Sequence, residues 1–358
     1  MQMSDNILSF VAIVLGFWTV INILYLIKKD LFESRGFKLY YGIVLAYRRK
    51  YSPKARSVYR KLSYLGIPLS LYGIYVFYAT MGYTLLVKLG FINVAGFRGP
   101  TLLIPGINIT GMSLLYFSIA VVIAATIHEL AHALVAASND IPVKGLGFAI
   151  IFFLPIAFTE IDEEEFPKAS LKAKTLTLMA GPAANILLSL IMIGVLAIII
   201  SPYGLMVTDV VNGSIAEKYG ILPNSLILEI NNKPATLENL SNVTNINKTT
   251  TFTIKILLPS GETKVYNITK PAGEKLGIYI TQMPNMALIN LLGTQNSLII
   301  MNIVIWTQVV NLSLGIINIV PLFITDGGRI IYELSRKPIL GHIASMITLA
   351  ILVIALAP

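Results

Sequence analysis

The sequence contains no cysteine, and only three of its 358 residues are histidines. The absence of thiols excludes disulfide bonds, a cysteine nucleophile, iron–sulfur clusters and any zinc site built on thiolates. Charge is also scarce: charged residues make up 13% of the chain, against about a quarter in a typical soluble domain. Because hydrophobic residues amount to 55% and the mean hydropathy is +0.75, a water-soluble fold is excluded.

In place of charge, the chain has long apolar runs. A helix needs about 20 mostly apolar residues to cross a bilayer. The sequence therefore predicts a polytopic α-helical membrane protein. Six membrane-spanning helices are expected, at residues 7–27, 63–87, 112–138, 175–200, 297–319 and 339–357. The net charge of +9 comes largely from basic residues beside the spans, so no nucleic acid partner is expected.

The basic residues predict the orientation. Residues 28–61 hold eleven lysines and arginines but only two acidic residues. Such loops stay on the cytosolic side of a membrane. Alternation of the spans then places residues 203–285 outside the cytosol. We expect a multi-pass protein of the cell membrane, embedded in the lipid bilayer.

Residues 203–285 have a different character, with short alternating runs typical of strands. Strands are expected near 205–211, 226–230, 251–258 and 263–269, and helices near 214–219 and 236–245. The stretches Gly204–Val207, Gly213–Ala216 and Leu226–Pro234 resemble a PDZ domain of the protease-associated kind. Such a domain binds a peptide or a chain end in its groove by adding a strand. The alternative is a module that acts only as a steric cap.

A metal-binding pattern lies inside the third predicted span. His128 and His132 are four residues apart, so on a helix both imidazoles face one side and can reach one divalent ion. Glu129 is placed to meet a water molecule at that ion. A charged residue at mid-membrane costs about 2.5–3.5 kcal/mol unless it has partners. Metal binding supplies such partners, whereas a simple packing pair of histidines does not.

A third ligand must come from elsewhere in the chain, because catalytic zinc usually has three protein ligands and one open position. The residues leave two candidates. Asp326 ends an uncharged run of 50 residues and is followed by Gly327 and Gly328, which allow close backbone packing. His342 lies near the start of the last span. Asp326 could also be a helix N-cap, and His342 a packed side chain.

Three motifs together resemble the site-2 proteases, which are intramembrane zinc metalloproteases. In chain order they are His128-Glu-Leu-Ala-His132, Gly181-Pro-Ala-Ala-Asn185 and Asn318-Ile-Val-Pro-Leu-Phe-Ile-Thr-Asp326-Gly-Gly328. The resemblance covers roughly residues 112–357. It implies that Asp326 joins His128 and His132 around one Zn²⁺ per chain.

The same resemblance implies the chemistry. The substrate would be a membrane protein, cut at a peptide bond within or near its transmembrane segment, with Glu129 as the general base. Asn318 would help to hold the substrate or its oxyanion. Asn185 would lie beside the site, and we expect it to bind substrate.

The spans, the inserted module and the three motifs together give the expected domain organisation. Residues 1–111 would form two N-terminal transmembrane helices with the basic loop, and residues 112–202 the first part of the catalytic membrane core. Residues 203–285 would form the PDZ-like domain, and residues 286–358 the second part of the core and the last helix. The active site is expected toward the cytosolic half of the membrane.

Residues 145–159 are uncharged, rich in phenylalanine and isoleucine, and too short to span a bilayer. Non-helical backbone at membrane depth occurs only inside protein or along a cavity that holds water. We expect a re-entrant β segment, a hairpin whose free edge pairs with an unwound substrate. Ile150, Ile151 and Phe152 are the expected substrate-binding residues. The alternative is a loop that dips to the membrane interface.

Two other functions remain open from the residues alone. The histidines and the aspartate could form the translocation site of a membrane metal-ion transporter, because ionisable residues inside a membrane often mark ion pathways. The chain could also be a non-catalytic scaffold that presents a peptide-binding module.

Overall fold

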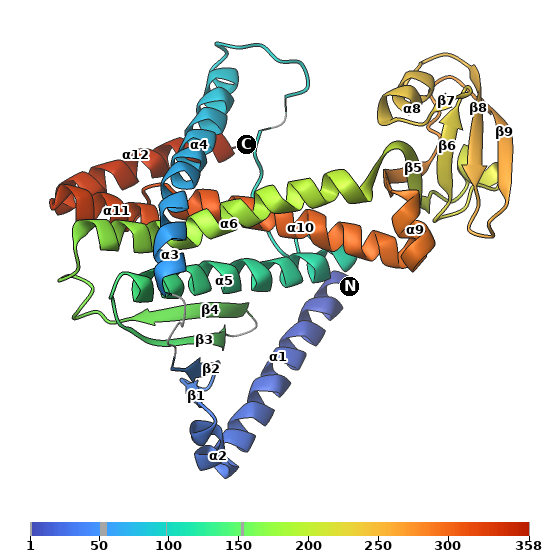
Figure 1. Cartoon of the computed structure of the whole chain (residues 1–358). Helices are drawn as coiled ribbons and strands as arrows, with labels where there is room; N and C mark the ends of the chain where they lie inside the picture. The colour runs from blue at the N-terminus through green and yellow to red at the C-terminus, as the bar shows by residue number, and fades with distance from the viewer. Residues whose placement is uncertain (1, 51–55, 98, 152–153, 358) are drawn as a thin grey trace. The chain divides into compact units, whose positions relative to one another are not determined.

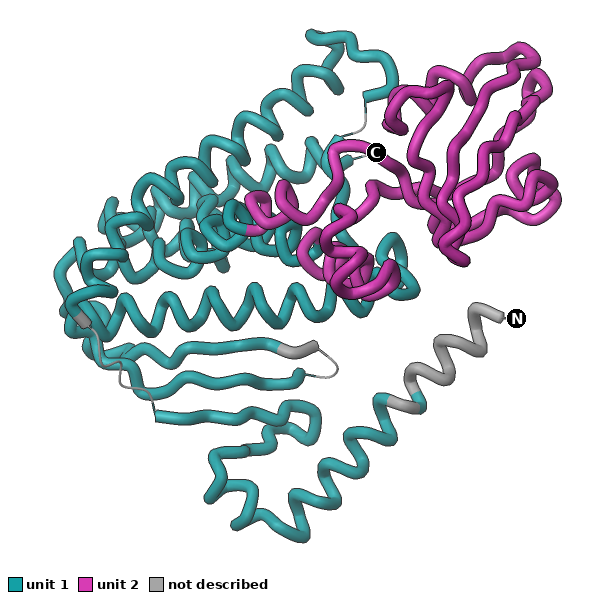
Figure 2. Tube along the Cα trace, turned by 45° about the vertical axis from the view of Figure 1, so that its right-hand side comes forward, with its two compact units in different colours: residues 1–191, 306–358 teal, residues 192–305 magenta. Residues whose placement is uncertain are grey.

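The computed structural model describes residues 2–50, 56–97, 99–151 and 154–357. The chain divides into two compact units, shown in Figure 2: residues 1–191 with 306–358, and residues 192–305. Both divisions fall within long helices. The second unit is therefore inserted into the sequence of the first.

The described residues contain five helical stretches that are long and apolar enough to cross a membrane. They are Ser57–Lys88, formed by α3 (Arg56–Leu62), a short 3₁₀ turn and α4 (Gly66–Lys88), then α5 (Met112–Ser138), α6 (Leu171–Ile199), α10 (Thr294–Ile319) and α12 (Pro338–Leu356). These helices are those of a multi-pass membrane protein. The first predicted span lies in α1 (Gln2–Ile27), where the apolar stretch that is described is Val14–Ile27. The number six therefore stays a prediction.

Small side chains let α5 approach α10 closely. Ala120 and Ala124 of α5 are fully buried and pack with Val310 of α10. Such contacts between small residues are the usual means by which helices associate in lipid. They bring α5 and α10 together over their middle turns, and the two helices run side by side in Figure 1. His128 and His132 follow Ala124 on α5, one and two turns further along.

The first unit also contains a four-stranded antiparallel sheet in the order β1-β2-β3-β4. Its strands are β1 (Phe37–Tyr40), β2 (Val44–Arg49), β3 (Val143–Ile151) and β4 (Leu154–Ile161). The β-hairpin expected within residues 145–159 is present as β3 and β4. The basic segment is more than a loop, since it also contributes α2 (Lys29–Ser34) and the β1–β2 hairpin.

The free edge of the β3–β4 hairpin is not where the sequence suggested. Ala149 of β3 lies opposite Ala46 of β2 on one side and Ile156 of β4 on the other. Ile150 and Ile151 therefore lie in an interior strand, because β2 occupies the side of β3 that was expected to be free. The free main-chain edge next to the membrane helices is β4. Phe152 lies outside the described residues.

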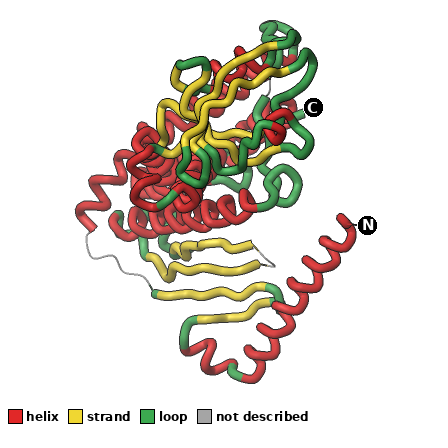
Figure 3. Tube along the Cα trace, turned by 90° about the vertical axis from the view of Figure 1, so that its right-hand side faces the viewer, coloured by secondary structure: helices red, strands yellow, loops and turns green. Residues whose placement is uncertain are grey.

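The second unit is built on a six-stranded antiparallel sheet. Five strands follow the order β10-β5-β6-β8-β9, and β7 pairs with β6. The elements are β5 (Ile200–Val210), α7 (Ile215–Lys218), β6 (Leu226–Ile230), β7 (Lys233–Pro234), α8 (Leu237–Thr244), β8 (Thr250–Leu257), β9 (Thr263–Lys270), β10 (Ile278–Pro284) and α9 (Met286–Leu292). Figure 3 shows its strands from the side. Every strand and helix expected in residues 203–269 is present, and β10 is an addition that pairs with β5.

Alternation explains which faces of these strands are buried. In β8, Phe252, Ile254 and Ile256 point to one face and are nearly or fully buried in the core of the unit. A lysine is also buried there: Lys270, at the end of β9, is 1% exposed. Its ammonium group donates to the carbonyl oxygens of Ile246, Pro271 and Glu274 at 3.0–3.3 Å.

We expect Lys270→Met to destabilise the second unit by about 2–3 kcal/mol, because it leaves three buried carbonyl groups without their charged donor. The matched control is Lys255→Met. Lys255 forms a half-exposed ion pair with Glu229 at 2.8 Å, and such pairs contribute about 0–1 kcal/mol. The full chain is heated in detergent, and the onset of proteolysis within residues 192–305 reports the stability of each variant. Equal stability of the two variants would contradict the structural role of Lys270.

Candidate metal centre

Helix α5 presents two imidazoles on one buried face. His128 and His132 are 8% and 7% exposed. Their Nε2 atoms lie 3.1 Å apart, as the four-residue spacing on a helix requires. Both rings therefore direct a nitrogen into the same small volume.

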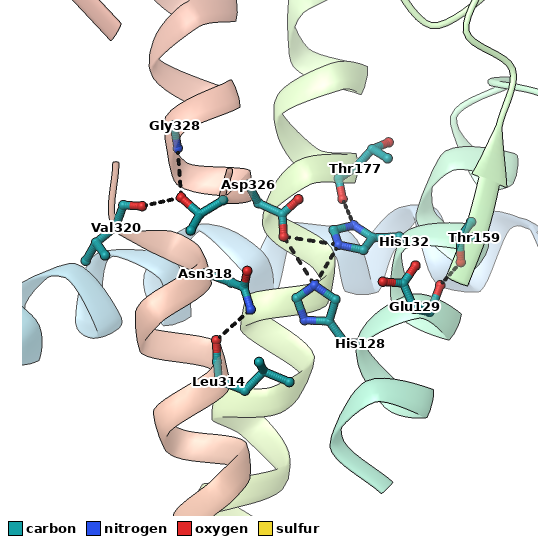
Figure 4. Close-up of polar contacts among 11 residues, drawn as sticks. His128, Glu129, His132, Thr159, Thr177, Leu314, Asn318, Val320, Asp326 and Gly328 are labelled. Carbon is teal, nitrogen blue, oxygen red and sulfur yellow. Dashed lines mark hydrogen bonds and ion pairs between the residues drawn. The ribbon is translucent and has the colours of Figure 1, made fainter. Parts of the chain in front are cut away.

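Helix α11 (Asp326–Ser335) brings a carboxylate to the same place. The Oδ2 atom of Asp326 lies 3.2 Å from Nε2 of His128 and 3.2 Å from Nε2 of His132 (Figure 4). Among the described residues, these three side chains form a cluster that could hold a metal ion. Of the two candidates for the third ligand, Asp326 thus lies beside the histidines.

The other candidate lies elsewhere on the same unit. His342 belongs to α12, and its ring packs against that of Phe323 with centroids 5.7 Å apart. It is not part of the three-residue cluster. The reading of His342 as a packed side chain fits this position.

The turn before α11 explains how Asp326 is positioned. Helix α10 ends at Ile319, and Thr325 then caps α11: its hydroxyl accepts from the N–H of Gly328 at 3.3 Å and donates to the carbonyl of Val320 at 2.7 Å. A Cβ atom at Gly327 would overlap the carbonyl oxygen of Ile319. The N-cap is thus Thr325 rather than Asp326, which leaves the carboxylate of Asp326 free to face α5.

The second glycine is needed for the same reason. A Cβ atom at Gly328 would overlap the carbonyl oxygen of Leu322. The two glycines after Asp326 therefore let the first turn of α11 pack directly on the backbone that leaves α10. Any side chain at either position would push the carboxylate away from the histidines.

Helix α6 supports the histidines from the other side. Nδ1 of His132 donates to the carbonyl oxygen of Thr177 at 2.7 Å. A carbonyl only accepts, so the proton of this ring is on Nδ1 and Nε2 carries a free lone pair. One turn further, Gly181 faces both rings: a Cβ atom there would overlap Nε2 of His132 and lie 2.7 Å from Nε2 of His128.

The donor set fits a tetrahedral divalent metal. Ligands held at about 2.0–2.1 Å in tetrahedral geometry are about 3.3 Å apart, close to the separations of the three ligand atoms here. Oδ2 of Asp326 is buried and has no hydrogen-bond partner among the described residues. Two imidazoles and one carboxylate leave a fourth position open, as in catalytic sites.

Two further predicted residues lie next to this cluster. Glu129 is partly buried on α5, and Figure 4 shows its carboxylate beside the two imidazoles, away from Asp326. Its own carbonyl oxygen accepts from the hydroxyl of Thr159 at 2.6 Å, which ties β4 to the histidine helix. Asn318 of α10 lies near Asp326 and His128, and its amide donates to the carbonyl of Leu314 at 3.0 Å, so one amide proton remains.

The other residues predicted to belong to the site are not part of the three-residue cluster. Asn185 is on α6, one turn beyond Gly181, and is 0% exposed. Ile150 and Ile151 lie in β3, described above. Sequence reasoning missed Thr177, Thr159 and Thr325. Thr177 contributes only its carbonyl, which any residue has, so no signal in the sequence could have identified it.

One cavity borders the cluster and a second lies along β4 and α11. One of about 470 Å³ is lined by Asp326 together with Phe323, Tyr332 and His342. The other, of about 760 Å³, follows the end of β4 from Phe158 to Ile161 and reaches Arg329 of α11. The guanidinium of Arg329 stacks on the ring of Phe166, 4.4 Å from its centroid. Space is thus available on both sides of the first turn of α11.

Comparison with known proteins gives the family. The model of peptidase family M50 matches residues 116–357, which include all three motifs. A curated relative, the uncharacterized protein MJ0971 of Methanocaldococcus jannaschii, is 31% identical over 215 residues, 58% of this chain and 54% of the relative. The chain thus spans about half the length of that relative. With its apolar helices and its histidine–aspartate cluster, the chain belongs to peptidase family M50, the family of the site-2 proteases.

Proposed function

We propose that this protein is an intramembrane zinc metallopeptidase that hydrolyses a peptide bond within or near the transmembrane segment of a membrane-protein substrate. The observation that carries the proposal is the meeting of His128, His132 and Asp326 on membrane-spanning or adjoining helices, with Glu129 beside them. A path for metal ions needs several ionisable groups in sequence along the membrane, whereas the ionisable groups here form one tight cluster.

One Zn²⁺ per chain would be held by His128, His132 and Asp326. When bound, zinc supplies a water molecule of lowered pKa and a Lewis acid for the scissile carbonyl. The buried position of the three ligands keeps competing solvent away from the ion. The proton on Nδ1 of His132 stays fixed by Thr177, so its Nε2 remains a ligand.

Glu129 would take the proton from the attacking water and pass it to the leaving amine. Its carboxylate lies beside the ligands but is not one of them, as a general base requires. Asn318 would use its remaining amide proton to hold the substrate carbonyl or its oxyanion. Both side chains come from helices that also carry or adjoin a ligand, so their positions are linked to the metal.

The substrate must be held in an extended form, because a helix hides its peptide bonds. The free edge of β4 offers main-chain groups to which an unwound segment can add as a further strand. Thr159 of this strand is bonded to the backbone of Glu129, so the added strand would run beside the general base. Ile150 and Ile151 would contribute side chains from the neighbouring strand rather than an edge.

The proposed topology has six spans. The basic residues 28–61 would lie on the cytosolic side of the membrane, and the order of the spans then puts the active site toward the cytosolic half. Residues 203–285 would form an extracytoplasmic PDZ-like domain. Its edge strand β10 follows Gly277, whose φ is +80°, and is paired on one side only. A peptide or chain end would add at this edge.

Glu129→Gln tests the general base. We expect the variant to keep its zinc and to lose at least about 100-fold in cleavage rate, the usual contribution of a general base. Glu238→Gln, an exposed change on α8, is the control and should cleave at the wild-type rate. Purified protein in detergent, a single-span substrate and metal analysis supply the measurements. Near-normal cleavage by Glu129→Gln would give the role of base to another residue.

Gly181→Ala tests the metal site without touching a ligand. The added methyl group would overlap the imidazole nitrogens that hold the ion, so zinc content should fall from about one per chain to a small fraction. Gly194→Ala on the same helix is the matched control, since a Cβ atom there has nothing within 4 Å. Full zinc content in Gly181→Ala would place the metal elsewhere or show that none is bound at this cluster.

A further inference from the structure

The face of α6 that carries Thr177 and Gly181 continues to Asn185. These residues are four apart, so they lie in one row along the helix. Thr177 is bonded to His132, and Gly181 faces both His132 and His128. Because α5 and α6 run antiparallel here, the next residue of the row lies toward His128 and the turn before it.

His128 has a ring nitrogen that needs a partner on that side. Its Nε2 points to the other two ligand atoms. When Nε2 binds a metal ion, the ring proton is on Nδ1, which is then a donor. This Nδ1 is buried and has no hydrogen-bond partner among the described residues. Figure 4 shows it pointing away from Asp326, toward the turns of α6 and α10 beyond the cluster.

Asn185 carries complementary groups. Its side chain is 0% exposed, and neither its Oδ1 nor its Nδ2 has a hydrogen-bond partner within the described parts of the chain. Buried polar groups are almost always bonded to protein or to ordered water, and most strictly so inside a membrane. An amide without exposed surface cannot contact substrate in this conformation, so its role lies behind the ligands.

A third buried side chain without a full set of hydrogen bonds lies on α10, and its level can be compared with that of Asn185. Gln308 of α10 donates to the hydroxyl of Ser189 at 3.1 Å, and Gly315 of α10 packs against Pro182. Asn311 lies three residues after Gln308 and four before Gly315. Asn185 lies three residues after Pro182 and four before Ser189. Both asparagines thus lie between the two contacts Gln308–Ser189 and Gly315–Pro182, at nearly the same height along the antiparallel helices α6 and α10.

Asn311 is 0% exposed. Its Nδ2 donates to the carbonyl of Thr307 at 2.8 Å, and its Oδ1 has no hydrogen-bond partner in the described chain. The unpartnered groups of these three side chains are complementary: Nδ1 of His128 and Nδ2 of Asn185 can donate, and Oδ1 of Asn185 and Oδ1 of Asn311 can accept. The hydroxyls of Thr175 and Thr177 on α6 are also buried without a partner in the described chain.

We propose that Asn185 and Asn311 form a buried hydrogen-bond relay that positions His128. None of these atoms is directly hydrogen-bonded to another in the described chain, so each step of the relay runs through an ordered water molecule. The Nδ1–H of His128 donates by way of one water to Oδ1 of Asn185, and Nδ2 of Asn185 donates by way of another to Oδ1 of Asn311. The proposal rests on the proposed function, in which His128 is a metal ligand.

The relay gives His128 what the carbonyl of Thr177 gives His132. A fixed proton on Nδ1 orients the ring and raises the basicity of the liganding nitrogen. Asn185 and Asn311 are thus positioning residues. They also connect α5 to α10, the helix that leads to Asp326, so the two ligand-bearing segments are aligned through α6.

The test measures metal binding rather than activity. Apo protein in detergent is titrated with zinc against a chelator, and the absorption bands of bound Co²⁺ report the ligand geometry. We expect Asn185→Ala to weaken zinc binding by about 10- to 100-fold and to shift the Co²⁺ bands, as loss of such a partner does. Asn185→Asp keeps the acceptor for His128 but loses the donor to Asn311, so it should bind zinc more tightly than Asn185→Ala and more weakly than the wild type.

Two further variants keep the test decisive. Asn311→Ala removes the last link and should weaken zinc binding in the same direction by a smaller factor, which provides the answer if Asn185→Ala fails to fold. Gln308→Ala removes a polar contact of the same helix pair outside the relay and should bind zinc as the wild type does.

The relay is overturned if Asn185→Ala and Asn311→Ala bind zinc like the wild type, or if Gln308→Ala is weakened as much as they are. It is also overturned if Asn185→Asp is no better than Asn185→Ala. A wild-type chain that binds neither zinc nor Co²⁺ would instead overturn the proposed function itself.

Discussion

The structure depends on one constraint: polar groups inside apolar helices must find partners, because lipid offers none. Two imidazoles and a carboxylate meet within 3.1–3.2 Å of one another, at the point where α5 and the start of α11 approach. Each of these groups alone would be costly at membrane depth. A shared ion would make them mutual partners, and the surrounding helices are arranged to keep them together.

Close backbone approach is the means of that arrangement. Gly181 brings the backbone of α6 against the imidazoles, and Gly327 and Gly328 let α11 pack on the end of α10. These positions tolerate no side chain because atoms of the site or its supports already fill the space. The glycines and the ligand residues are therefore packed against one another in one site, although their motifs are far apart in the sequence.

Much of this could be predicted from the sequence, for identifiable reasons. The spacing of His128 and His132 fixes their common face on any helix, and uncharged runs mark the spans. The choice between Asp326 and His342 could not be made from the residues alone, since it depends on how distant helices pack. The carbonyl of Thr177 has no sequence signal at all. Strands β1 and β2 were hidden by the lysines and arginines around them, which suggested only a cytosolic loop.

The position of β1 and β2 has a consequence for how the family core is delimited. The family match begins at residue 116, yet β2, which precedes it in the chain, pairs with Leu146–Ile151 of β3. A fragment cut at the start of the matched region would leave one edge of these residues unpaired, with β4 still on the other side. Such an uncovered strand invites pairing with a second molecule. The N-terminal hairpin thus covers β3 and moves that edge of the sheet to the short strand β1, while β4 remains the edge strand on the side of the histidine helix.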